Sequence, residues 1–90
     1  MTAKTYHLRI FHLGHEKARW EDQLDLDSEA RLAEVFVAAA DAHNRTMRVR
    51  NYAEWRMEVY RLSDQRPDLR GARLARVTKD AVGRTVVTRP

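Results

Sequence analysis

The hydrophobic pattern of the chain contains one clear amphipathic helix, between Asp27 and His43. At 100° per residue, the side chains of this stretch separate into a stripe suited to a core and an opposite polar or small stripe. The first stripe consists of Leu32, Val35, Phe36, Ala39 and His43, and the second of Arg31, Glu34, Ala38 and Asp41. Asp27 and Ser28 are good helix caps because their oxygens accept hydrogen bonds from first-turn amides. We therefore predict a helix over 27–43, ended by Asn44 in the left-handed conformation.

A period of two predicts strands before the helix. Residues 6–13 (YHLRIFHL) alternate between two faces, as a half-buried strand does. Gly14 and the polar residues 15–17 offer a turn, and every second residue from Trp20 to Leu26 then falls on one side of an extended segment. We predict a β-hairpin that leads into the helix. Its second strand is the weaker half because acidic residues have poor strand propensity.

Residues 52–62 (YAEWRMEVYRL) fit two patterns. Tyr52, Trp55, Val59 and Leu62 match a helix, whereas Trp55, Met57 and Val59 alternate with Arg56, Glu58 and Tyr60 as in a strand. The β-branched and aromatic content favours the strand. The preceding residues 46–51 remain open between a short strand and an irregular connection.

The C-terminal third predicts a second hairpin. Residues 63–70 are polar and contain Pro67, so we expect a loop. Residues 72–79 and 84–88 then form two strands, joined by a turn in which Gly83 suits a positive φ.

Together these elements read ββαβββ, a single α+β domain over residues 1–90. The expected architecture is a single helix packed on one face of a mostly antiparallel four- to five-stranded sheet. One helix covers only one face, so the other face meets solvent or a partner. The residues expected beneath the helix are Tyr6, Leu8, Ile10, Trp55, Met57 and Val59. Those expected on the second face are His7, Arg9, Phe11, Arg56, Glu58, Tyr60 and Leu62.

The composition limits the ways in which this domain is stabilised and located. The 90 residues include no cysteine, so neither disulfides nor a cysteine-based zinc site reinforces the small core. No apolar run approaches the roughly 18 residues of a membrane span, and the N-terminus lacks a signal-peptide pattern. The expected location is cytoplasmic.

Charge is distributed unevenly along the chain. Residues 1–44 hold five basic and eight acidic side chains, and residues 45–90 hold twelve basic and five acidic ones. Arginine supplies fourteen of the seventeen cations, and its planar fork suits phosphates, carboxylates and aromatic faces. A nucleic-acid or acidic partner is one explanation. GC-rich coding, which enriches arginine and alanine, is the other, and both stay open.

No motif in the chain predicts catalysis, a metal or a cofactor. The candidate ligands His7, His12, His15, Glu16 and His43 lack the helical HExxH spacing of zinc sites, and the three glycines are isolated rather than grouped in a phosphate loop. No nucleophile is paired with a base. We therefore expect a non-catalytic protein with no cofactor and no small-molecule substrate.

Two kinds of macromolecular partner fit the second sheet face. For protein binding or homodimer formation, the expected interface residues are Phe11, Tyr60, Leu62, Arg9 and Arg56, because aromatics and arginine are enriched at interface hot spots. The alternative is nucleic acid, with bases stacked on the same face. Its phosphates would then contact Arg45, Arg48, Arg50, Arg66, Arg70 and Arg73. Protein binding is the leading hypothesis because no RNA-binding signature is present and Glu58 falls in the middle of the face.

The layout of the chain also resembles a group of natural proteins. It combines an opening strand YHLRIFHLG, an acidic return into an alanine-rich helix, and the paired strands of GARLARVTKDAVGRTVV. This layout is similar to that of small proteins of high-GC actinobacteria and their phages. The resemblance implies no activity and transfers no functional residue. It makes a bacteriophage accessory protein that binds a host or phage macromolecule a natural role.

Overall fold

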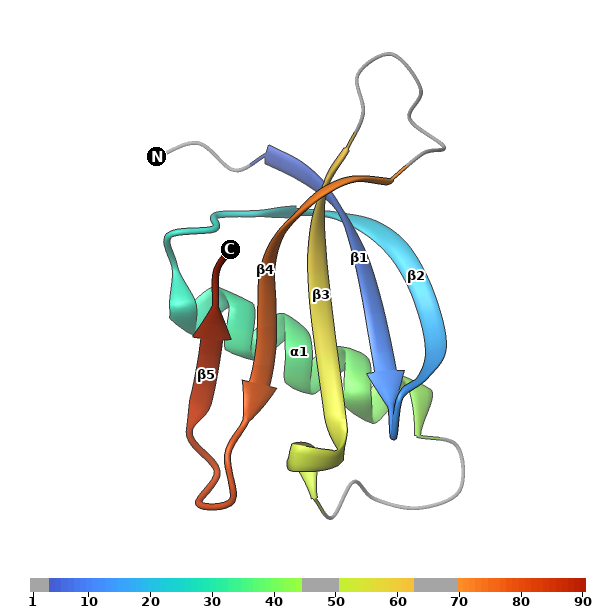
Figure 1. Cartoon of the computed structure of the whole chain (residues 1–90), viewed down its shortest axis with the longest axis vertical. Coiled ribbons are helices and arrows are strands. Elements are labelled where there is room, and N and C mark those ends of the chain that lie inside the picture. Colours follow the sequence, from blue (N-terminus) through green and yellow to red (C-terminus); the bar gives the residue numbers. More distant parts are fainter. Residues whose placement is uncertain (1–3, 45–50, 63–69) are drawn as a thin grey trace.

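The fold is one helix packed against a five-stranded antiparallel sheet, as the computed structural model shows for residues 4–44, 51–62 and 70–90. The α+β prediction is thus confirmed, with five strands in the order β2-β1-β3-β4-β5 (Figure 1). The elements are β1 (Lys4–His12), β2 (His15–Leu24), α1 (Glu29–His43), a 3₁₀ turn (Tyr52–Glu54), β3 (Trp55–Leu62), β4 (Arg70–Lys79) and β5 (Thr85–Thr88).

The first hairpin is longer and its turn tighter than the sequence predicted. Its loop is only Leu13 and Gly14, both with positive φ (50° and 83°), so His15 already begins β2 and the predicted turn at 15–17 is wrong. Two left-handed residues match the twist of the flanking strands. Nine of the ten residues of β2, all but Lys17, pair with β1 despite their weak strand propensity, because the ladder with β1 overrides local preference.

Helix α1 starts where its cap predicts. The Ser28 hydroxyl accepts a hydrogen bond from the Arg31 amide at 3.2 Å, and the helical residues begin at Glu29. The end of the helix differs, because Asn44 has φ −94° and ψ 93°. The prediction of a left-handed Asn44 is wrong, since the chain leaves the helix in extended backbone.

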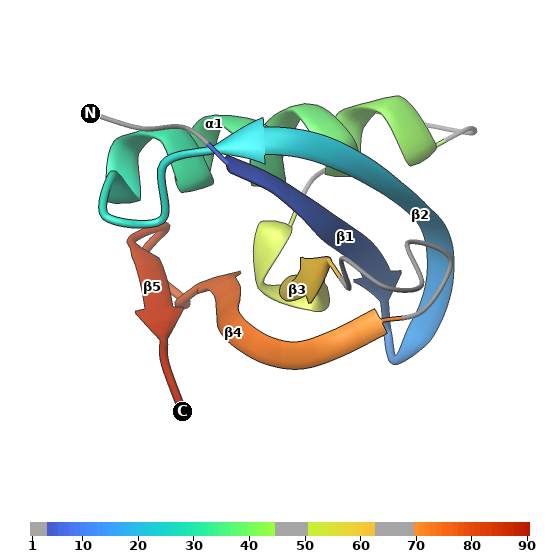
Figure 2. The same ribbon diagram turned by 90° about the horizontal axis from the view of Figure 1, so that it is seen from above.

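The core lies between α1 and one face of the sheet. Leu32, Val35, Phe36 and Ala39, which the periodicity assigned to the core stripe, are all buried. They meet a layer from four strands that includes Leu8, Ile10, Leu24, Met57, Val59 and Val77, each at most 1% exposed. Strand register places these residues on one face of the sheet, and α1 lies across one face of the sheet in both views (Figures 1 and 2).

Residues 52–62 divide between the two patterns that they fitted. The strand prediction is confirmed for 55–62, where Trp55, Met57 and Val59 are buried, whereas 52–54 form one 3₁₀ turn. The Asn51 side chain accepts a hydrogen bond from the Ala53 amide at 3.0 Å and so caps this turn. A helix that continued from it would turn the buried residues of β3 away from the core.

The second hairpin matches its prediction, with Gly83 at φ 85°. Two boundaries are wrong: Arg70, expected in the loop, begins β4, and β5 begins at Thr85 rather than at Arg84. The predictions for residues 46–50 and for the loop at 63–69 lie outside the described residues. Within the part of the chain that the structure describes, no helix is long and apolar enough to cross a membrane.

Candidate functional site

The sheet face away from α1, hereafter the open face, carries the densest group of charged and aromatic side chains among the described residues. Cross-strand register sets its membership, because residues opposite one another share a face. Arg9 lies between Arg19 of β2 and Glu58 of β3, and Glu58 lies opposite Arg76 of β4. The members are His7, Arg9, Phe11, Glu16, Arg19, Glu21, Arg56, Glu58, Tyr60, Arg73 and Arg76.

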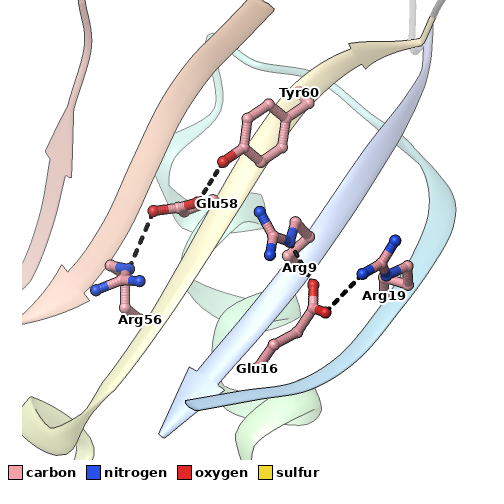
Figure 3. A network of polar contacts seen from close by, with 6 residues as sticks. All are labelled: Arg9, Glu16, Arg19, Arg56, Glu58 and Tyr60. Atoms are coloured by element: carbon pink, nitrogen blue, oxygen red, sulfur yellow. Dashed lines mark hydrogen bonds and ion pairs between the residues drawn. The ribbon is translucent and has the colours of Figure 1, made fainter. Parts of the chain in front are cut away.

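Glu58 is the centre of the larger charged cluster on this face. It is only 5% exposed. It lies near three arginines, Arg56 on its own strand β3 and Arg73 and Arg76 on the adjacent strand β4. Its Oε2 is 3.1 Å from Arg56 Nε, 3.7 Å from Arg76 Nε and 4.0 Å from Arg73 Nη1. Its Oε1 accepts a hydrogen bond from the Tyr60 hydroxyl (Figure 3). A buried carboxylate needs such partners, because isolation in a low dielectric is costly.

The contacts of Glu58 with the arginines are mainly electrostatic. The Nε atoms of Arg56 and Arg76 are buried and make no hydrogen bond within the described residues. Arg56 Nε and Glu58 Oε2, 3.1 Å apart, therefore form an ion pair in which the N–H does not point at the oxygen. The side chains of Arg56, Arg73 and Arg76 keep 34%, 38% and 39% of their surface exposed. One carboxylate therefore faces three guanidinium groups that still reach solvent.

A second, smaller cluster lies on β1 and β2. The Glu16 carboxylate accepts hydrogen bonds from Arg9 through Oε1 and from Arg19 through Oε2, the latter at 2.8 Å (Figure 3). Partial burial would by itself raise the pKa of Glu16, but the hydrogen bonds and charges of the two arginines outweigh it and lower that pKa. Burial by itself would lower the pKa of Arg9, but the hydrogen bonds and charge interactions with Glu16 and Tyr60 outweigh burial and raise that pKa. Both groups are thus charged at neutral pH.

The aromatic rings of the open face lie beneath arginine. Phe11 is 7% exposed, and the guanidinium carbons of Arg9 and Arg56 lie 4.7 and 4.3 Å from its ring centroid. The guanidinium carbon of Arg9 is also 5.9 Å from the Tyr60 ring centroid, and the His7 ring meets Tyr60 edge-on. Cation–π attraction stabilises such stacks and fixes the guanidinium planes. The guanidinium groups of Arg9 and Arg56 are therefore held in place.

The predicted interface residues are only partly brought together. Ring and guanidinium contacts link Arg9, Phe11, Arg56 and Tyr60, whereas Leu62 ends β3 two residues beyond Tyr60 and takes no part in these contacts. There it lies with Tyr6, Leu26 and Leu74 around a depression at the end of the sheet. Because Phe11 is buried under arginine and Tyr60 is half-buried, the face is a charged surface rather than an apolar patch.

The predicted phosphate contacts are mostly untested by the structure. Arg45, Arg48, Arg50 and Arg66 lie outside the described residues, as does the side chain of Arg70. Arg73 is described, and it belongs to the Glu58 cluster.

Sequence reasoning did not place Glu16, Arg19, Glu21 or Arg76 on this face, and it considered Glu16 only as a metal ligand. Arg76 alternates with Ala75 and Val77, so the period of its strand was a signal that could have found it. Glu16 was hidden because it was assigned to a turn.

The histidines serve other contacts. His12 stacks on Trp55 with a centroid separation of 4.5 Å, and its Nε2 is 3.4 Å from Glu54 Oε1. Among the described residues, no three histidine, aspartate or glutamate side chains are grouped to hold a metal ion. Comparison of the chain with protein-family models, with curated proteins and with solved structures gave no match.

Proposed function

We propose that this chain is a small, non-catalytic module that binds a protein partner through its open face. The observation that carries the proposal is the set of arginines pinned over Phe11 and around Glu58. Arginine and aromatic residues are enriched at interface hot spots. Side chains already held by stacking and ion pairs also lose little conformational entropy when a partner binds.

The charge of the open face favours a different protein over a second copy of this chain. The face holds five arginines and three glutamates, so it is net positive. In a two-fold symmetric dimer the same patch meets itself, and like charges brought together without counter-charges are unfavourable. A partner with an acidic surface meets no such penalty.

Nucleic acid is the second candidate, supported by the partly exposed Arg73 and Arg76. Base stacking of the kind expected from the sequence receives less support. It needs an accessible aromatic face, whereas the Phe11 ring is covered by two guanidinium groups.

Site-specific photo-crosslinking in the native cells tests the proposal. p-Benzoylphenylalanine replaces Val86, which is 40% exposed and lies on the open-face side of β5, opposite Thr78. The matched control carries it at Glu34, whose side chain is 71% exposed on α1. We expect Val86 to give one discrete protein adduct that excess unlabelled chain competes away, and Glu34 to give none.

The mass of the adduct separates the candidates. An adduct of twice the 10.6 kDa chain mass would identify a second copy, and a nuclease-sensitive adduct would identify nucleic acid. Equal labelling from both positions, or none from Val86, would contradict the proposal.

A further inference from the structure

The Glu58 cluster holds more positive charge than its own carboxylate neutralises. Arg56, Arg73 and Arg76 surround one Glu58 side chain, which leaves two formal positive charges. Glu58 itself is 7% exposed at its side chain, whereas each arginine is at least 34% exposed. An approaching molecule therefore meets guanidinium groups first.

These guanidinium groups are arranged for recognition of anions. Two of them come from β4 and one from β3, so they lie on adjacent strands about 4.8 Å apart. Arginine presents five N–H donors in a fork. With Nε of Arg56 and Arg76 buried against Glu58, their terminal nitrogens are the atoms left to bind an external oxygen.

The distribution of acidic residues on the same face indicates which anion fits. A nucleic-acid backbone carries a negative charge at every nucleotide, and a strand crossing this face would also meet Glu16 and Glu21. A polypeptide can place a carboxylate opposite the arginines and a neutral or basic residue opposite each glutamate. Mixed charge of this kind selects a protein partner by complementarity.

We infer that Arg56, Arg73 and Arg76 form a carboxylate-binding site for an acidic segment of the partner protein, with Glu58 holding the three guanidinium groups in place. This inference rests on the proposed function and adds the chemistry of the partner. It assigns Arg73 and Arg76 as the contacts with the partner, since their side chains are the most exposed of the three.

Binding of a fluorescent peptide with alternating glutamate and threonine tests this site. Its affinity is measured by anisotropy at about 50 and 150 mM salt, a range over which exposed charge pairs are increasingly screened. We expect Arg73→Gln and Arg76→Gln each to weaken binding about three- to tenfold. Arg84→Gln removes the same charge from an exposed residue beside the β4–β5 turn and should change affinity less than twofold.

Three results would overturn the inference. The first is an equal loss of peptide affinity in Arg84→Gln, which would indicate general attraction to a basic protein. The others are tighter binding of oligothymidylate of matched charge than of the peptide, and no peptide binding at all. Circular dichroism of each variant shows whether it is folded, and Arg73→Lys, which keeps the charge, provides a milder second variant. It should lose less affinity than Arg73→Gln. If the peptide does not bind but the Val86 crosslink to a protein persists, only the acidic nature of the partner segment is refuted. If no Val86 crosslink forms, the proposed function itself is refuted.

Discussion

At the scale of single residues, Glu58 is the side chain on which the open face depends. It combines near-complete burial with three arginines and a tyrosine hydroxyl. Removing one partner of a buried ion pair leaves the others uncompensated, which costs more than the pair itself contributes. At this position the carboxylate has three guanidinium groups and one hydroxyl as partners.

Glu58→Gln is expected to lower the free energy of unfolding by about 1–3 kcal/mol, because three guanidinium groups then repel one another around a neutral amide. Urea denaturation measures the change. Glu34→Gln is the matched control, since Glu34 is 71% exposed and 3.7 Å from Arg31, and it should stay within about 0.5 kcal/mol. Equal effects of the two substitutions would mean that Glu58 has no special role.

Glu16 predicts a pH dependence of stability. Its pKa is lowered in the folded state, so its carboxylate stabilises the fold above its unfolded pKa of about 4.3 and that contribution disappears as the pH falls through the folded value. The stability difference between the natural chain and Glu16→Gln should therefore be constant between about pH 6 and 7. It should shrink progressively below about pH 4.3. Denaturant titrations across this range measure it, and a difference that grows on acidification would contradict the argument.

At the scale of the elements, the β1–β2 turn is the position where sequence and conformation disagree. Leu13 is 62% exposed and has φ 50°, a region that costs most residues with a side chain about 1 kcal/mol or more. Asparagine followed by glycine is the preferred pair for this turn. The tight loop is retained because the ladder on both sides fixes its length.

Leu13→Asn should raise the free energy of unfolding by about 0.5–1 kcal/mol, since asparagine tolerates a positive φ. Gly14→Ala should lower it by about 1 kcal/mol from backbone strain alone, because nothing within 4 Å would meet the added methyl group. Thermal and urea denaturation measure both. Val82→Asn is the control, because Val82 is exposed in the other turn and has no positive φ. This substitution should not raise the free energy of unfolding. A gain in stability equal to that of Leu13→Asn would show that only exposure matters.

At the scale of the whole molecule, two layers produce two different surfaces. Helix α1 covers one face of the sheet with apolar side chains, and no described element covers the other (Figures 1 and 2). The sheet also brings arginines from both halves of the chain together, Arg9 and Arg19 from the first and Arg56, Arg73 and Arg76 from the second. The open face therefore mixes arginines from both halves, although its surplus positive charge comes from Arg56, Arg73 and Arg76 of the basic half.

The sequence by itself determined the elements and the faces of their residues. A period of two in β1 and β3 and of 3.6 in α1 records which face a side chain occupies, and Leu8, Ile10, Phe36 and Met57 lie where these periods placed them. The α+β class followed from the order of the elements. The turn at Leu13, the extended Asn44 and the short 3₁₀ turn at 52–54 did not follow, because cross-strand pairing and chain direction outweigh local preference at the ends of elements.

Only the tertiary structure decided which charges meet. Strand order and register place Glu58 between Arg56, Arg73 and Arg76, and Glu16 between Arg9 and Arg19, although the partners of Glu58 on β4 are 15 and 18 positions away in sequence. No local pattern encodes the contacts between different strands, since a shift of one residue in register would send every side chain to the other face. The open face was predictable as a surface, and its electrostatic character was decided by the pairing of the strands.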